Sequence, residues 1–154
     1  MKLLILSDSH GYRSGMERAV ETEKPDWIIH LGDFASDAQW LREQYPSIRF
    51  CSVPGNCDRD PVTPAVQLHR FGKLSVLVTH GHTLGVKYDL QRLYYSAAES
   101  GASLALFGHT HCRHLERFGD VVLFNPGTCG GSGATYGVVE IFDDGRFDCH
   151  PIDL

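Results

Sequence analysis

The sequence lacks any segment that could cross a membrane. A helical span needs roughly 20 apolar residues in a row, and no run approaches that length in the 154 residues. The apolar start of the chain meets a carboxylate at Asp8, which is too early for a signal peptide. We therefore expect a cytoplasmic protein with no membrane partner.

The chain also lacks an excess of positive charge. Lys and Arg total 14 against 19 Asp and Glu, the formal net charge is -5, and the basic residues are scattered. Such a surface offers no broad attraction to nucleic-acid backbones, which argues against nucleic acid as a partner. A phosphate substrate would then need metal ions or a local patch to hold it.

Cysteines are present, but they form no pattern that suits a disulfide framework or a thiolate zinc site. Their number is odd and no close C-x-x-C pair occurs. We expect reduced thiols that serve mostly as small hydrophobic side chains. The five are Cys51, Cys57, Cys112, Cys129 and Cys149.

The first half of the chain alternates strand-like and helix-like segments. Continuous apolar runs at Lys2–Ser7, Asp26–Leu31 and Ile48–Val53 predict strands buried on both faces. Between them, Gly15–Thr22 and Ser36–Tyr45 each carry an apolar stripe at helical spacing. This order predicts a parallel sheet with right-handed crossovers.

The second half changes character after chain breaks at Pro61 and Pro64. A hairpin is predicted from Ala65–Arg70 and Leu74–Thr79, followed by a helix over Lys87–Glu99. Further strands, mainly antiparallel, are predicted at Ser103–Phe107, His114–Arg117, Val121–Phe124, Tyr136–Phe142 and Arg146–Ile152. The length suits one domain, residues 1–154, and no linker or repeat divides it.

Polar side chains follow the predicted strands at their carboxyl ends, where the loops of an α/β sheet converge on a ligand. Carboxylate, imidazole and amide donors suit Mn²⁺, Fe, Ni²⁺ or Zn²⁺ better than Ca²⁺ or Mg²⁺. Seven such donors exceed what one ion needs, and two ions sharing a carboxylate would form a clamp for phosphoryl transfer. The seven are Asp8, His10, Asp33, Asn56, His80, His109 and His111.

At these residues the sequence resembles the calcineurin-like metallophosphoesterases. Five blocks stand in the order of that family: Asp8-Ser9-His10-Gly11, Gly32-Asp33, Gly55-Asn56-Cys57-Asp58, Thr79-His80-Gly81-His82 and Gly108-His109-Thr110-His111. The short length and the Asn-Cys-Asp form are similar to the compact, single-domain prokaryotic phosphodiesterase branch. The resemblance implies an α/β fold of two facing mixed sheets flanked by helices, in four α/β/β/α layers.

The resemblance also implies a division of the seven donors between two divalent transition-metal ions, with Mn²⁺ favoured and Ni, Fe or Zn as alternatives. In the family pattern one ion is held by Asp8, His10 and His111, the other by Asn56, His80 and His109, and Asp33 bridges. The implied reaction is in-line attack on a small phosphodiester by a hydroxide that bridges the metals. Asn56, His80 and Arg13 are the expected contacts to substrate, with Arg59 and Arg113 as further candidates.

One block departs from the family pattern. Many members carry His after the Asn, where it can protonate the leaving group, whereas this chain has Cys57. A thiol is a poorer general acid at neutral pH. We therefore expect a preference for diesters over simple monoesters, with Asn56, Cys57 and Asp58 as the catalytic candidates of this loop and Asp58 or a metal-bound water as the proton source.

Several other residues have a structural interpretation beside a functional one. His82 could orient His80, and Asn125 could lie near the metals, but each also suits a turn. Cys112 is expected to be structural. We expect surface or strand-edge positions for His30, His69, His114 and His150, and a helix packing face, with a possible homo-oligomer contact, for Tyr88, Leu90, Leu93, Tyr94 and Tyr95.

Two other functions compete with a small-molecule phosphodiesterase. The same fold serves as a non-catalytic subunit of the retromer coat, so the chain could be a protein-binding scaffold. Two-metal sites also cut nucleic acids, although a nuclease would be expected to carry a basic stripe. The intact donor set favours an enzyme over the scaffold.

Overall fold

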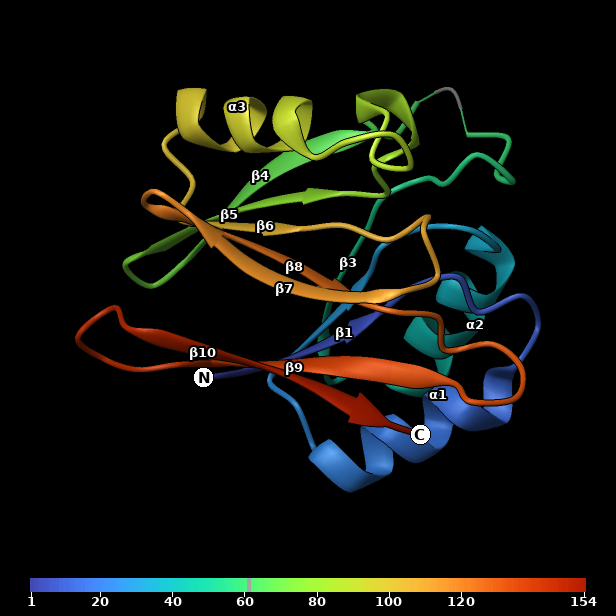
Figure 1. Cartoon of the computed structure of the whole chain (residues 1–154). Coiled ribbons are helices and arrows are strands. Elements are labelled where there is room, and N and C mark those ends of the chain that lie inside the picture. The colour runs from blue at the N-terminus through green and yellow to red at the C-terminus, as the bar shows by residue number, and fades with distance from the viewer. Residues whose placement is uncertain (61) are drawn as a thin grey trace.

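Two five-stranded mixed sheets face one another in the structure, a computed structural model that describes residues 1–60 and 62–154. The outer face of one sheet is covered by helices α1 and α2, and that of the other by α3 (Figure 1). This confirms the four-layer arrangement that the resemblance implied. The predicted chain break at Pro61 lies outside the described residues.

The first sheet has the strand order β10-β9-β1-β2-β3. Its parallel part consists of β1 (Lys2–Leu6), β2 (Trp27–His30) and β3 (Arg49–Ser52). Helix α1 (Arg13–Glu23) connects β1 to β2, and α2 (Ala35–Gln44) connects β2 to β3. The predicted alternation of strands and helices is therefore confirmed, with boundaries shifted by at most two residues.

Strand β1 explains why the apolar run at the start of the chain is unbroken. Its side chains alternate between two cores, so that Leu3 and Ile5 lie between the sheets while Leu4 and Leu6 pack under the helices. All four are fully buried. Burial of each such side chain contributes roughly 1.5–3 kcal/mol, and a polar residue on either face would interrupt one of the cores.

The second sheet has the order β4-β5-β6-β8-β7. Its strands are β4 (Val66–Phe71), β5 (Leu74–Thr79), β6 (Leu104–Leu106), β7 (Arg113–Phe118) and β8 (Val121–Pro126). The β4–β5 and β7–β8 pairs are antiparallel, whereas β6 is parallel to both of its neighbours. The predicted hairpin is confirmed.

The chain ends with a return to the first sheet. Strand β9 (Thr135–Ile141) pairs antiparallel with β1, and β10 (Phe147–Asp153) pairs antiparallel with β9. The C-terminal third is thus mainly antiparallel, as predicted. Residues far apart in sequence become neighbours at β1, which brings the loops after both sheets to one end of the sandwich.

The third helix begins later than predicted. A 3-10 turn, η1, covers His82–Leu84, and α3 covers only Gln91–Glu99. The backbone N–H of Gln91 donates to Oδ1 of Asp89 at 3.0 Å, so a side-chain oxygen satisfies an N–H of the first turn there. Within residues 1–60 and 62–154, none of the helices has both the length and the apolarity that a bilayer span needs.

The aromatic residues around α3 divide into packed and exposed groups. Leu93 is fully buried, and Leu90 and Tyr94 pack against the same core. Tyr88 and Tyr95, however, are 93% and 59% exposed, so the predicted packing role is wrong for these two. Whether they contact a second copy of the chain stays a prediction.

The expectation of a surface position is wrong for His30. This residue ends β2 with no exposed area, on the same side of the strand as the buried Ile28. Its Nδ1 accepts the N–H of Gly32 at 3.3 Å, and its Nε2 is buried without a partner. Burial lowers the pKa of His30 from 6.5 to about 4, because the charged ring would lose its hydration. The sequence offered no signal for this, because an isolated His after an apolar run suits a strand end equally well.

Acid should therefore destabilise the protein partly through His30. In the unfolded chain this ring takes a proton near pH 6.5, whereas in the folded chain it does so only near pH 4. The unfolded state then binds more protons between these values, and the free energy of unfolding should fall by about 3 kcal/mol as the pH drops through this window. Across this pH range, the free energy of unfolding measured with urea should change less steeply with pH for His30→Gln than for the wild type. The exposed strand residue His150 provides the control, since His150→Gln should leave the slope unchanged. Equal slopes for His30→Gln and wild type would contradict this assignment.

Candidate metal centre

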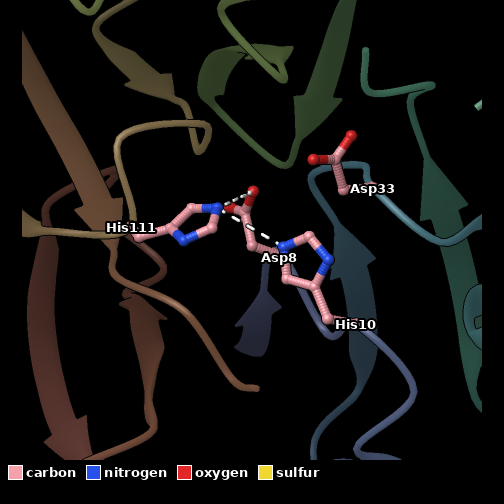
Figure 2. Close-up of side chains that lie close together, drawn as sticks. All are labelled: Asp8, His10, Asp33 and His111. Atoms are coloured by element: carbon pink, nitrogen blue, oxygen red, sulfur yellow. Dashed lines mark hydrogen bonds and ion pairs between the residues drawn. The ribbon is translucent and has the colours of Figure 1, made fainter. Parts of the chain in front are cut away.

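The loops that follow five strands converge at one end of the two sheets. Asp8 and His10 follow β1, Asp33 follows β2, Asn56 follows β3, His80 follows β5, and His109 and His111 follow β6. Four of these residues offer ligand atoms that all lie within 4.8 Å of one another (Figure 2), namely Asp8, His10, Asp33 and His111. Loops from both sheets thus contribute to one cluster.

Two imidazoles and one carboxylate form the first part of this cluster. Nε2 of His111 lies 3.0 Å from Oδ1 of Asp8 and 3.4 Å from Nε2 of His10. Both imidazoles are exposed, whereas the carboxylate is fully buried. Two ring nitrogens and an oxygen that lie close together, contributed by the loops after β1 and β6, are the donor types of a transition-metal site.

His80 organises the second part. Its Nδ1 lies 2.8 Å from the carbonyl oxygen of Leu31. A carbonyl can only accept, so Nδ1 must be the donor, and in the neutral ring Nε2 keeps a lone pair.

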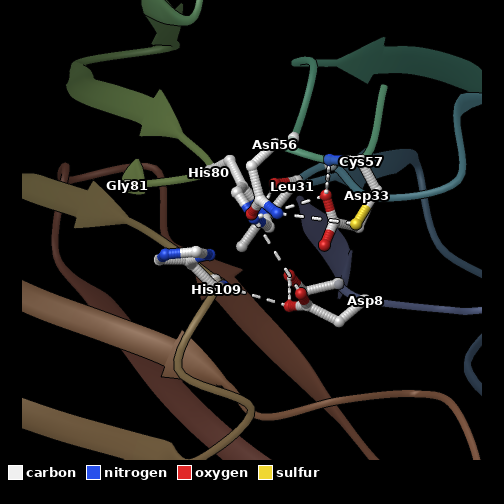
Figure 3. Close-up of polar contacts among 12 residues, drawn as sticks. Asp8, Leu31, Asp33, Asn56, Cys57, His80, Gly81 and His109 are labelled. Atoms are coloured by element: carbon white, nitrogen blue, oxygen red, sulfur yellow. Dashed lines mark hydrogen bonds and ion pairs between the residues drawn. The ribbon is translucent and has the colours of Figure 1, made fainter. Parts of the chain in front are cut away.

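That Nε2 has three side-chain oxygen atoms as neighbours. Oδ1 of Asn56 lies at 3.1 Å, Oδ1 of Asp33 at 3.6 Å and Oδ1 of Asp8 at 4.0 Å (Figure 3). A nitrogen lone pair among three acceptor oxygens is repulsive unless a cation lies among them, and either a proton on Nε2 or a metal ion would supply it. A carbonyl partner on the other nitrogen is also what metal-binding histidines usually have.

The carboxylate of Asp8 gives an independent test of whether a metal fits. Its Oδ2 accepts the hydroxyl of Ser7 and the N–H of His109, the latter at 3.1 Å. Its Oδ1 is buried and accepts no hydrogen bond. A buried, charged oxygen without a donor is costly. The fact that it is also the oxygen nearest to His111 Nε2 indicates a cation site at this atom.

Asp33 lies between the two groups. Burial raises the pKa of this carboxyl, but the N–H of Cys57 and the charges of His80 and His10 outweigh burial and hold the pKa below its usual value. The N–H of Cys57 donates to Oδ1 at 2.9 Å. The ionised form is therefore available as a ligand for a cation.

His109 lies at the edge of the cluster. Its ring centroid is 4.9 Å from that of His80, and its backbone N–H, rather than its ring, contacts Asp8. Burial lowers the pKa of His109 to about 4, and the charges of His80 and Lys87 act in the same direction. At neutral pH the ring is uncharged and keeps a lone pair, as a metal ligand must.

The backbone at this site is strained in a consistent way. Seven non-glycine residues adopt a positive φ, and five of them are predicted ligands, with φ between 46° and 68°. Left-handed backbone is unfavourable for residues with a Cβ, and such strain persists at functional sites when the surrounding structure enforces it. The five are Asp8, His10, Asp33, His109 and His111.

Asp37 is a residue of the site that the sequence did not reveal. This buried carboxylate accepts from the hydroxyl of Ser9 at 2.8 Å, the N–H of Gly11 at 2.7 Å and Nε of Arg13 at 2.9 Å. Burial raises its pKa, but these hydrogen bonds outweigh burial and lower it. Asp37 thus fixes the loop that carries His10. It lies inside α2 with nothing in its neighbourhood to mark it, so only the fold identifies it.

Arg13 is partly occupied by this network. Besides its bond to Asp37, its guanidinium lies over the ring of Trp40, 5.3 Å from the centroid. A contact from its remaining nitrogens to substrate stays a prediction. Of the other arginine candidates, Arg113 pairs with Asp153 at 2.9 Å and Arg59 is exposed.

Asn125 supports the loop of His109 and His111. Its amide donates to the carbonyl of Gly108 at 2.9 Å and to the hydroxyl of Thr110 at 3.1 Å. On the opposite side, the hydroxyl of Thr128 donates to the carbonyl of Asp8 at 2.8 Å. These contacts combine the two interpretations of Asn125, which opens a turn and also positions the site.

Polar groups just after Asn56 hold this loop against the start of α2. Asp58 accepts the N–H of Ala35 at 2.7 Å and that of Gly55 at 2.8 Å, so it caps α2 from a distance. Cys57 is exposed, and a hydrogen bond to Asp33, with burial a lesser cause, raises the pKa of its thiol. The thiol therefore stays protonated at neutral pH. A role in proton transfer stays a prediction for both residues.

His82 and Cys112 lie outside the donor cluster. The His82 ring centroid is 5.4 Å from that of His80, but Nδ1 of His80 donates to the carbonyl of Leu31, which orients the His80 ring instead. Cys112 is exposed next to His111. A surface hollow of about 490 Å³ lies beside α2, and its lining contains none of the predicted ligands. Its lining mixes apolar and charged side chains but holds no cluster of metal donors, so we do not expect the reaction to take place there.

Two glycines make the close packing of the ligand loops possible. A Cβ added to Gly55 would overlap the Asp33 carboxylate and its backbone nitrogen, and one added to Gly108 would overlap the hydroxyl of Ser7. We expect Gly55→Ala to displace Asp33 and to weaken Mn²⁺ binding at least about tenfold, measured by calorimetric titration. Gly101→Ala is the matched control. It should cost roughly 1 kcal/mol in left-handed strain but leave metal affinity unchanged, because its Cβ meets open space. Unchanged affinity in Gly55→Ala would contradict the proposed packing.

Comparison with known proteins gives a consistent result. The family model described as the calcineurin-like phosphoesterase superfamily domain matches residues 1–144. The chain is 34% identical over 131 residues to the probable metallophosphoesterase YsnB of Bacillus subtilis, which covers 83% of this chain and 75% of that protein. It is 29% identical over 168 residues to the phosphodiesterase YfcE of Escherichia coli, with 91% and 88% covered.

The fold also extends to a more distant protein. The structure of Vps29 from Entamoeba histolytica matches 100% of this chain and 99% of that chain with a TM-score of 0.78, at 18% identity, a likeness that concerns the fold alone. The family match covers nearly the whole chain and includes every loop of the donor cluster. This metallophosphoesterase fold, the candidate metal cluster and the family model together show that the chain belongs to the calcineurin-like phosphoesterase superfamily.

Proposed function

We propose that this chain is a phosphodiesterase that uses two divalent metal ions to hydrolyse small phosphodiesters. The observation that carries the proposal is the position of His80 Nε2, which faces oxygens of Asn56, Asp33 and Asp8 while Nδ1 is engaged by the carbonyl of Leu31. A second donor group, around His111 and Asp8, lies on the other side of Asp33. The similarity to the phosphodiesterase YfcE supports the choice of a diester.

The donors divide between the two ions as the family pattern implies. Asp8, His10 and His111 would hold one ion, and Asn56, His80 and His109 would hold the other. Asp33 would be shared, which its ionised state and its contacts with both groups support. Manganese is the favoured ion, with nickel, iron and zinc as alternatives, because imidazole and carboxylate donors accept all four.

When bound, such a pair of ions acidifies a water molecule for in-line attack and neutralises the phosphoryl oxygens. The chain's own residues contribute by holding the metal ligands in place. Leu31 holds the ring of His80 through Nδ1, Asp37 holds the loop of His10, and the N–H of Cys57 holds Asp33. Asn56 can offer its oxygen to a cation and its amide hydrogens to a phosphoryl oxygen. Arg13 would reach substrate through its Nη groups, because Nε donates to Asp37.

The leaving group must receive a proton, and this loop holds no efficient acid for that. The raised pKa of Cys57 keeps its thiol protonated but makes it reluctant to donate. Both oxygens of Asp58 already accept backbone N–H groups. Activated esters, which leave without help, should therefore react best, and among simple esters diesters are favoured over monoesters.

Replacement of the shared carboxylate tests the proposal. In Asp33→Asn we expect diesterase activity, measured with bis(p-nitrophenyl) phosphate and added Mn²⁺, to fall at least about 100-fold, together with the metal content. Asp26→Asn is the matched control, since Asp26 lies at the opposite end of β2 and is exposed. Wild-type protein that binds no metal and hydrolyses no ester would favour a scaffold, and faster cleavage of oligonucleotides than of small diesters would favour a nuclease.

Replacing Cys57 by the His that many family members carry there tests the explanation of the preference for diesters over monoesters. In Cys57→His an imidazole replaces a thiol of raised pKa at an exposed position, so a better proton donor becomes available to the leaving group. We expect the ratio of p-nitrophenyl phosphate to bis(p-nitrophenyl) phosphate hydrolysis to rise by roughly 10- to 100-fold. Cys112→His, at an exposed position outside the cluster, should not change the ratio. If Cys57→His leaves the ratio as it is, Cys57 does not set the preference.

A further inference from the structure

A hollow of about 410 Å³ adjoins the candidate metal centre. It is lined by residues 82–85 and by Tyr88, Asp89 and Arg92. His82 belongs to this lining and also borders the centre, with its ring centroid 5.4 Å from that of His80 and 6.1 Å from that of His109. A ligand at the centre would therefore lie one imidazole away from the hollow.

The aromatic ring in this hollow has almost no packing role. Tyr88 is 93% exposed, and a Cβ added to Gly85 would meet its ring at 3.8 Å. Tyr136, by contrast, is buried and donates its hydroxyl to Glu23 at 2.9 Å. An exposed ring beside the centre offers a face for stacking, and base stacking on aromatic side chains is a common mode of nucleotide binding.

The same segment carries positive charge that the fold does not use. Among the described residues, the lysines and arginines in ion pairs are Lys2, Arg13, Arg113 and Arg146. Arg92 is not one of them, although it is exposed in the first turn of α3, where the helix dipole disfavours a cation. Lys87 is likewise outside these pairs, and its charge acts on His109.

Charge and aromaticity thus coincide beside the centre in a chain of formal net charge -5. A second aromatic hollow, of about 330 Å³, is lined by Tyr94, Tyr95 and Phe118, among others. It shares no residue with the donor cluster and contains no lysine or arginine. Of these two hollows, the one at Tyr88 is therefore suited to a substrate that also reaches the metals.

We propose that the hollow lined by Tyr88 and Arg92 receives one arm of the phosphodiester and that this arm is a nucleotide. This inference rests on the function proposed above. Its planar base would stack on Tyr88, and an additional negative charge on the arm would be held by Arg92. The metal centre would bind the scissile phosphate. The substrate class is then a nucleotide-containing diester rather than an alkyl diester.

Binding measurements isolate the role of Tyr88. In Mn²⁺-loaded protein, adenosine 5′-monophosphate should bind about tenfold more tightly than ribose 5-phosphate, because the two share sugar and phosphate but only the first has a base. Tyr88→Ala should abolish this preference in calorimetric titrations. Tyr95→Ala, which removes an exposed tyrosine from the other hollow, should retain it. A wild type without the preference, or Tyr88→Ala that keeps it, would overturn the assignment.

The charge of the arm is tested with a second ligand pair. Adenosine 5′-diphosphate should bind several-fold more tightly than the monophosphate, and Arg92→Gln should remove this gain. Arg42→Gln, at an exposed arginine that lines the hollow beside α2, should not. A gain that persists in Arg92→Gln would refute the role of this residue.

Turnover of bis(p-nitrophenyl) phosphate by the same preparations separates the two proposals. If the protein hydrolyses this diester but its preference for adenosine 5′-monophosphate over ribose 5-phosphate does not depend on Tyr88, the proposal of a nucleotide arm is refuted and the proposed function stands. Protein that hydrolyses no diester with any of the candidate metals would refute the function, and the inference with it.

Discussion

The structure depends on one electrostatic constraint, the need to hold oxygen and nitrogen lone pairs together at the end of two sheets. His80 Nε2 faces three oxygens, and Oδ1 of Asp8 is buried without a donor. With the His80 ring neutral, such an arrangement is unfavourable by itself, because clustered acceptors repel one another and the buried ones, such as Oδ1 of Asp8, lose hydration. A cation reverses the sign of these interactions. The left-handed backbone of five predicted ligands indicates that the fold accepts further strain to keep this geometry.

The two cores supply the stability that offsets these costs. Strand β1 places side chains into both, with Leu3 and Ile5 between the sheets and Leu4 and Leu6 under the helices. Because β1 is held on both faces and paired with β2 and β9, the loop that starts at Ser7 begins from a rigid point. Asp37 and Thr128 then hold that loop from outside the cluster. Rigid strands, together with hydrogen bonds between neighbouring loops, explain how a site can be assembled from five separate loops.

The sequence predicted the elements whose signal is local or strongly patterned. The unbroken apolar run of β1, the hairpin of β4 and β5 and the order of the polar loops all follow from the periodicity of side chains and from turn residues. Features that depend on partners distant in the chain were not predictable in this way. Asp37 contacts residues 24 to 28 positions away, and the burial of His30 follows from helices packed over β2. The late start of α3 has a local correlate instead, because the side chain of Asp89 accepts the N–H of Gln91 and so marks the first turn of the helix. For the ligands themselves, the sequence indicated which residues could meet, while distances such as the 3.1 Å from Asn56 to His80 required the structure.

The central claim is that two cations share Asp33, and the most direct measurement is the stoichiometry and magnetic coupling of bound Mn²⁺. Metal-free protein titrated with Mn²⁺ and followed by electron paramagnetic resonance should bind two ions per chain, with a spin-coupled spectrum that Asp33→Asn abolishes. A single uncoupled Mn²⁺ per chain, or no binding, would contradict the account.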